Sequence, residues 1–325
     1  MSPSRPVGAT NALAVTGEAH HSVCSEPMVA TMRRTWLAVL LLAPGIAGCA
    51  VAQPAPIAGE GQPTPSPPAS LLPPGGGASV PLAPPLPTLD PIETEAAAAR
   101  LQAELLQQVQ DPVRQSPASV QRWITLARAM LAAHGTPIGR AQVLVVVDRN
   151  PLVQQLALIV AQPDAAWVML GGTHVSTGQP NRHGYYMTPT GVFLHDGSVL
   201  DYRAQGTFNE NHIRGLGVKG MRIWDFGWQW ADKGWLHTGE RGQIRLLMHA
   251  TDPAYLARRI GRPASEGCVR VPADMNRFMD RHGVLDADYQ QMATYDAAYR
   301  AILSDNADPT PLAGDTLVVV DSSEE

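Results

Sequence analysis

Cysteine is scarce in this chain, with only Cys24, Cys49 and Cys268 among 325 residues. The first two lie in or before a segment that has the features of an export signal, so the exported protein would hold Cys268 without an internal disulfide partner. In an oxidising compartment an unpaired thiol is a liability unless its chemistry is needed. Cys268 is therefore a candidate nucleophile.

Several other features are missing. The formal net charge of −5 offers no basic footprint, so we expect no nucleic-acid partner. No glycine-rich nucleotide loop is present, and we expect no cofactor. None of the histidines shows the close paired spacing of zinc ligands, so we expect no metal and interpret most of them as surface or core residues. The histidines considered are His183, His195, His212, His237 and His249.

A long apolar membrane segment is also lacking. Arg33-Arg34 precede the short apolar run Trp36 to Ala43, and small residues follow it. A run of this length is too short for a permanent bilayer span and is typical of a secretory signal, which we place within residues 1–48. This N-terminus is over-long if Met28 or Met32 is the true initiator, and the arginine pair is a weak indication of twin-arginine export.

The segment Ile46-Ala47-Gly48-Cys49 resembles a bacterial lipobox, in which the cysteine is lipidated and becomes the mature N-terminus. By the same resemblance, Ala50 permits sorting to the outer membrane. We therefore expect a periplasmic protein that is lipid-anchored to a membrane, with the outer membrane favoured. The alternative is an ordinary cleaved signal with an incidental cysteine.

Residues 49–91 are rich in proline, glycine and small residues, and we expect a disordered tether, or a spacer of unselected length. Residues 92–138 follow as a helical segment. Within it, Ser116-Pro117 supply an N-cap and a first-turn proline, and Gly135 marks the end of the helix. We interpret this segment as structural.

From 139 to 322 the pattern is that of a mainly β domain with flanking helices. Short apolar runs alternate with polar turns, and no helices alternate with them, which favours an antiparallel or mixed sheet over a doubly wound one. The expected strands are 143–147, 156–160, 167–170, 244–248 and 316–320, with a helical segment around 274–299.

The chemistry of a cysteine nucleophile needs a base and an oxyanion site. His249 ends an apolar strand 19 positions before Cys268 and is the candidate base. Gly267 permits a sharp turn that exposes the sulfur and frees backbone amides at 267 and 268 for an oxyanion hole. Ser265 is expected to brace this loop rather than to react.

Together these residues resemble the L,D-transpeptidase (YkuD-type) catalytic domain of bacterial cell-wall enzymes. The resemblance rests on a histidine at a strand end followed by the segment Ser265-Glu266-Gly267-Cys268-Val269-Arg270. Upstream, Ser176-Thr177-Gly178 and Thr188-Pro189-Thr190-Gly191 match the family's STG and TPTG segments. The resemblance implies a YkuD-like β-sandwich, preceded here by the α-helical segment.

It also implies a reaction. The Cys268 thiolate, formed by His249, would attack the third residue of a peptidoglycan stem tetrapeptide and release D-alanine. An amine of a second stem or of a protein would then attack the resulting thioester and take over its acyl group. Arg270 would bind a substrate carboxylate, or else form a structural salt bridge.

Two positions depart from the family pattern. Glu266 stands where histidine is common and is expected to alter substrate preference, and Ala250 follows the catalytic histidine where glycine or serine is frequent. A tryptophan-rich expansion between 207 and 242 is interpreted as a local satellite core, with a lid or glycan platform as the alternative.

Two other functions stay open from the sequence. Water in place of the amine would make the same site an L,D-carboxypeptidase or endopeptidase. The third reading is a non-catalytic wall-binding lipoprotein, against which the retention of both His249 and Cys268 argues.

Overall fold

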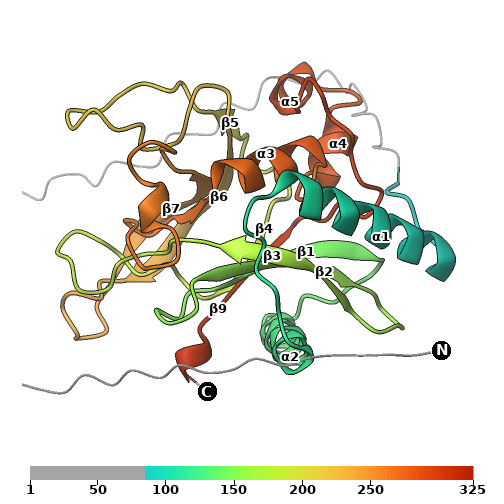
Figure 1. Ribbon diagram of the computed structural model, residues 1–325, viewed down its shortest axis with the longest axis horizontal. Coiled ribbons are helices and arrows are strands. Elements are labelled where there is room, and N and C mark those ends of the chain that lie inside the picture. The colour runs from blue at the N-terminus through green and yellow to red at the C-terminus, as the bar shows by residue number, and fades with distance from the viewer. Residues whose placement is uncertain (1–84, 325) are drawn as a thin grey trace, which may run out of the picture. The chain divides into compact units, whose positions relative to one another are not determined.

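Two mixed β-sheets form the frame of the protein in the computed structural model, which describes residues 85–324 (Figure 1). The first sheet has the strand order β3-β2-β1-β9-β4 and the second has the order β5-β6-β7-β8. The strands of the first sheet are β1 (Gln142–Asp148), β2 (Gln155–Ala161), β3 (Val168–His174), β4 (Gly191–Leu194) and β9 (Thr316–Val320). Those of the second are β5 (Tyr202–Arg203), β6 (Arg222–Asp232), β7 (Arg241–Ala250) and β8 (Val269–Val271).

Two helices precede the sheets. Helix α1 (Pro91–Gln108) begins at a capping box, in which the Asp90 side chain accepts from the Glu93 amide and Glu93 accepts from the Asp90 amide. Helix α2 (Pro117–Ala133) begins after Ser116, whose hydroxyl accepts from the Ser119 amide at 3.2 Å, and Gly135 with a φ of 62° follows its end. The cap signals therefore predicted α2 correctly.

The first sheet buries both of its faces because β1 alternates between two apolar clusters. Val143, Val145 and Val147 pack with Leu101 and Leu105 of α1, while the intervening side chains of β1 pack with α2. The two helices lie on opposite sides of this sheet (Figure 1). The first of these clusters also contains Trp224, Leu246 and Met248 of the second sheet. The two sheets thus share one core, and the predicted mainly β fold with flanking helices is confirmed.

The helical segment expected around 274–299 is divided into three short helices, α3 (Ala273–Arg281), α4 (Ala287–Met292) and α5 (Ala297–Ile302). Gly283, with a φ of 55°, follows the end of α3 and allows the chain to leave the helix. Two 3₁₀ turns, η1 (Ala257–Arg259) and η2 (Ser322–Glu324), complete the described elements.

The predicted signal within 1–48, Cys24, Cys49 and the tether up to residue 84 lie outside the described residues. Within residues 85–324, no helix is both long enough and apolar enough to span a membrane.

Candidate active site

Cys268 and His249 lie on one face of the second sheet. Strands β7 and β8 are parallel and in register, with Met248 paired to Val269 and His249 paired to Arg270. Paired residues point to the same side of a sheet, so Arg270 lies beside His249, and Cys268, one residue before β8, comes level with Leu247. The partial burial of Cys268 against a cluster containing Leu247 and Ile223 agrees with this placement. The two predicted catalytic side chains are therefore diagonal neighbours on adjacent strands.

His249 is held in a defined tautomer. Its Nδ1 lies 2.7 Å from the carbonyl oxygen of Ala250, which can only accept, so Nδ1 carries the proton and Nε2 is left as the basic nitrogen. Burial lowers the pKa of His249 to about 4, and the nearby Arg270 cation lowers it as well. The imidazole is neutral at neutral pH and is able to accept a proton. Alanine at 250 serves this purpose because the contact is made by the backbone.

The thiol is also neutral at rest. Burial raises the pKa of Cys268, against opposing contributions from the Leu247 amide and Arg270. The sulfur lies 3.9 Å from the Arg245 carbonyl oxygen, and within residues 85–324 no hydrogen bond joins it to the His249 ring. Such contacts often tighten only when substrate binds. The geometry suits a histidine that takes the thiol proton during attack.

The cysteine loop is braced by its own Ser265 hydroxyl. Ser265 donates to the Cys268 carbonyl at 2.6 Å and accepts from the Gly267 amide at 3.2 Å, which is the bracing role expected from the sequence. Gly267 has a φ of 130°, and a Cβ there would lie 2.7 Å from the Ile244 side chain, so no other residue fits without strain. Because the Gly267 amide already has a partner, an oxyanion would have to share it.

The STG and TPTG segments form the support behind this loop. The Thr177 carbonyl accepts from the amides of Ala264 and Ser265, at 2.9 Å each. The buried Thr188 hydroxyl accepts from the Gly178 amide at 2.9 Å and donates to the Gly267 carbonyl at 2.8 Å. Both segments thus fix the backbone that leads into the cysteine.

Residues 142–287 match the family model described as the YkuD L,D-transpeptidase catalytic domain. This region is therefore similar to the YkuD domain. The matched residues include the two motif segments, His249 and the whole cysteine loop, and the family acts on peptidoglycan peptides. No curated protein matches the chain.

Arg270 of the matched region is partly buried beside both Cys268 and His249. Its Nη1 donates to the Ala264 carbonyl at 3.2 Å, and its Nε is buried without a hydrogen-bond partner. Within the described part of the chain Arg270 makes no ion pair, so the structural salt bridge considered from the sequence is absent there. Burial lowers the pKa of Arg270. Glu266 is exposed at the outer side of the loop.

Three neighbours of Cys268 were not predicted from the sequence. Strand pairing sets Tyr202 opposite Ile223 and Asp225 opposite Leu247, on the face that carries His249. Arg245 donates through Nε to both oxygens of Asp225, at 2.8 and 2.9 Å. Its Nη atoms make no hydrogen bond within residues 85–324, so the guanidinium can still receive an anion. Only the strand register brings Tyr202 and Asp225 to this face, and nothing in their spacing indicated it.

The tryptophan-rich expansion is divided between core and surface. Trp224 is fully buried, and the Trp235 ring packs 5.2 Å from the Tyr186 ring. Trp228 and Trp230, by contrast, are 62% and 55% exposed. The interpretation as a satellite core is wrong for these two indoles, because the strand that carries them faces solvent on that side.

One buried cluster of potential metal ligands lies outside the site. His195, Asp201 and Asp286 each place a ligand atom within 4.8 Å of the others. Arg222 already joins them, donating to Asp201 at 2.8 Å and to Asp286 at 3.0 Å. Burial opposes the charge on His195, but the hydrogen bond to Asp201 raises the pKa of this histidine. The cluster is a buried ion-pair network rather than a cation site.

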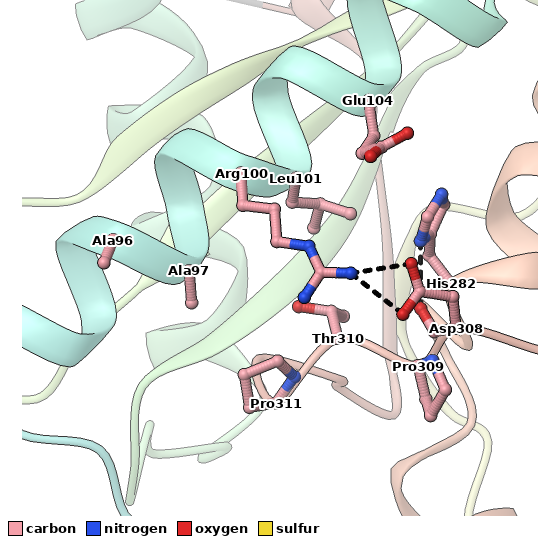
Figure 2. A pocket seen from close by; sticks show the side chains of 10 residues that line it. All are labelled: Ala96, Ala97, Arg100, Leu101, Glu104, His282, Asp308, Pro309, Thr310 and Pro311. Atoms are coloured by element: carbon pink, nitrogen blue, oxygen red, sulfur yellow. Dashed lines mark hydrogen bonds and ion pairs between the residues drawn. The ribbon is translucent and has the colours of Figure 1, made fainter.

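A separate pocket of about 240 Å³ lies between α1 and residues 308–311 (Figure 2). The Arg100 side chain reaches across it to both oxygens of Asp308, at 2.9 and 2.8 Å (Figure 2). Leu101, Pro309 and His282 contribute to its walls. It holds no nucleophile, so we assign the chemistry to the Cys268 face and not to this pocket.

Proposed function

We propose that this protein is a cysteine-dependent L,D-transpeptidase that acts on peptidoglycan stem tetrapeptides. The observation that carries the proposal is the register of β7 and β8, which sets Cys268 and a neutral, oriented His249 on one face of the sheet. A neutral thiol beside a neutral imidazole is the resting state of general-base-assisted attack.

In the first half-reaction His249 Nε2 takes the proton of the Cys268 thiol as sulfur attacks the carbonyl of the third stem residue. The amides of Cys268 and Gly267 are the candidate donors to the oxyanion. The bond to D-alanine breaks, its nitrogen receives the proton from His249, and a thioester remains on Cys268.

In the second half-reaction an amine attacks the thioester and gives up its proton to His249. The new amide forms and the thiol is restored. Arg245, whose Nη atoms make no hydrogen bond in the described part of the chain, and Arg270 are candidates to bind the carboxylates of the stem. The charge of Glu266 at the loop's outer side would influence which stem is accepted.

We also propose that the enzyme works in the periplasm from a lipid anchor at Cys49, preferably at the outer membrane. The support for this is the sequence from Arg33 to Ala50, with its basic start, apolar core and lipobox-like end. Mass spectrometry of the membrane-extracted protein should find a diacylated Cys49 peptide. An unmodified N-terminus near residue 50 would overturn the anchor and leave the reaction untouched.

The reaction is tested by incubating the purified full chain with disaccharide-tetrapeptides, alongside Cys268→Ala, and by reading products with liquid chromatography and mass spectrometry. We expect crosslinked dimers that have lost one D-alanine, absent with the variant. Cysteine-dependent tripeptide alone would establish hydrolysis instead. No cysteine-dependent product would contradict the proposal and favour a wall-binding role.

A further inference from the structure

Two solvent-exposed indoles lie on the catalytic face of the second sheet. In β6 and β7, Asp225 pairs with Leu247, Trp228 with Arg245, and Trp230 with Gln243. Because paired residues share a face, Trp228 and Trp230 stand on the side that carries His249 and Cys268. A continuous strip therefore runs from the nucleophile along the hairpin of β6 and β7, which is visible as two long strands in Figure 1.

A bulge in β6 puts both tryptophans on this side. The register shifts between Asp225 and Trp228, so that one extra residue enters β6 and the alternation is reset. The opposite face of the hairpin is occupied, since Ala231 is buried and a Cβ on Gly242 would lie 2.9 Å from the Tyr186 ring. The hairpin cannot turn its indoles inward, and their exposure is a fixed feature of the fold.

Exposed aromatic pairs next to a reactive group are characteristic of binding surfaces. Here planar polar groups lie between and beside the rings. The Arg245 guanidinium carbon lies 5.8 Å from the centre of the Trp228 ring, and Gln243 faces Trp230. At the far end Arg241 pairs with Asp232 at 3.3 Å. Flat apolar rings flanked by amide and guanidinium donors suit a hexosamine, which has an apolar C–H face and a rim of hydroxyl and acetamido groups.

A lipid surface would favour contiguous apolar or basic residues instead, and carboxylates stand at both ends of this strip.

The distances along the strip fit the substrate of the proposed reaction. Trp228 lies on the second strand from Cys268 and about two residues along the strand direction, which places it about 12 Å from Cys268. Trp230 lies two residues further along β6, about 17 Å from Cys268. Three extended residues of a stem peptide span about 10–11 Å at most. The sugar that carries the stem would thus meet the indoles when its third residue reaches Cys268.

We propose that Trp228 and Trp230 form a saccharide-stacking platform that binds the N-acetylated amino sugars to which the stem peptide is attached. The inference rests on the proposed function and deepens it: the favoured donor is the sugar-linked peptide and not the free peptide.

The test compares D-alanine release from the disaccharide-tetrapeptide with release from the same tetrapeptide without sugars. With the wild-type full chain, kcat/KM for the sugar-linked donor exceeds that for the free peptide by about tenfold or more. The ratio falls at least fivefold in Trp228→Ala and in Trp230→Ala and is largely restored by tyrosine at either position. Leu152→Ala, which removes another exposed apolar side chain in the turn after β1, is the matched control and keeps the wild-type ratio. Equal losses on both donors, or a wild-type ratio near one, would overturn the platform.

A binding measurement separates this inference from the proposed function. The Cys268→Ala protein is titrated by calorimetry with the β-1,4-linked tetramer of N-acetylglucosamine, which requires no turnover. Binding that disappears in the Trp228→Ala/Trp230→Ala double variant supports the platform even if no D-alanine is released from any donor. Absence of saccharide binding overturns it, as does tryptophan-dependent sedimentation with phosphatidylethanolamine–phosphatidylglycerol vesicles in place of saccharide binding.

Discussion

At the residue scale, burial acts on the two reactive groups in opposite directions and leaves both uncharged. It raises the pKa of the Cys268 thiol and lowers that of the His249 imidazole to about 4. The Arg270 cation stabilises the Cys268 thiolate but disfavours the His249 imidazolium. It therefore gives no net support to a thiolate–imidazolium ion pair between the two. In the proposed mechanism the resting protein therefore keeps its thiol protonated, which protects it from oxidation, and forms the thiolate when substrate excludes water.

This arrangement predicts a pH profile for alkylation. Iodoacetamide should modify the Cys268 peptide of the full chain with a half-maximal rate above the value of about 8.5 of a free cysteine. His249→Gln should change this resting profile little, because no ion pair is lost, while it lowers D-alanine release by about 10²–10⁴-fold. Peptide mapping by mass spectrometry distinguishes Cys268 from the other two cysteines. A midpoint below pH 7 that rises in His249→Gln would show a preformed thiolate–imidazolium pair instead.

At the element scale, the loop that carries Cys268 is held by hydrogen bonds from the segment just before β4. There the Thr188 hydroxyl accepts from the Gly178 amide and donates to the Gly267 carbonyl. Thr188→Val keeps the volume and removes the hydroxyl, so the buried Gly178 amide loses its acceptor. We expect the free energy of unfolding to fall by about 1–3 kcal/mol and kcat for D-alanine release to fall more than KM rises. Chemical denaturation and steady-state kinetics measure both effects. Thr190→Val, two residues away in the same motif and exposed, is the control; if it behaves like Thr188→Val, the Thr188 hydroxyl is not the support.

The sequence predicted those elements whose pattern is regular. Apolar runs marked β1, β2 and β9, and the proline and serine caps marked α2. It did not predict β6 as a strand, because buried Arg222 and Asp225 interrupt the apolar pattern and a bulge breaks the alternation before Trp228. Cys268 and His249 were predicted from residue type and motif. Arg245 was not, because its partner Asp225 lies in β6, the strand that the pattern failed to predict.

At the scale of the whole molecule, the catalytic domain is larger than its family match. Residues 142–287 contain the reactive groups but end before β9. That strand lies inside the first sheet, parallel to β1 and antiparallel to β4, and its residues Leu317 to Val320 are buried. Without β9, the strand that follows the TPTG segment would have no partner in the sheet.

The helices before the domain are equally part of its core. Leu101 and Leu105 of α1 cover one face of the first sheet, and Trp123 and Leu131 of α2 cover the other, all at most 5% exposed. Deleting them would leave buried strands with a solvent-exposed apolar surface, which destabilises the fold and promotes association.

We therefore predict that a fragment of residues 142–287 will not fold, whereas residues 85–325 will unfold cooperatively. A fragment of residues 139–325 restores β9 but lacks both helices, so it should be insoluble or unfold at a much lower temperature than residues 85–325. Far-UV circular dichroism during heating, together with size-exclusion chromatography, measures the difference. A cooperative transition in the 142–287 fragment would mean that β1 and β4 do not need β9, and the assignment of the helices and last strand to the catalytic core would be wrong. The site on β7 and β8 thus depends on residues far outside the motif that identifies it, because the face opposite Cys268 packs against the sheet that those elements complete.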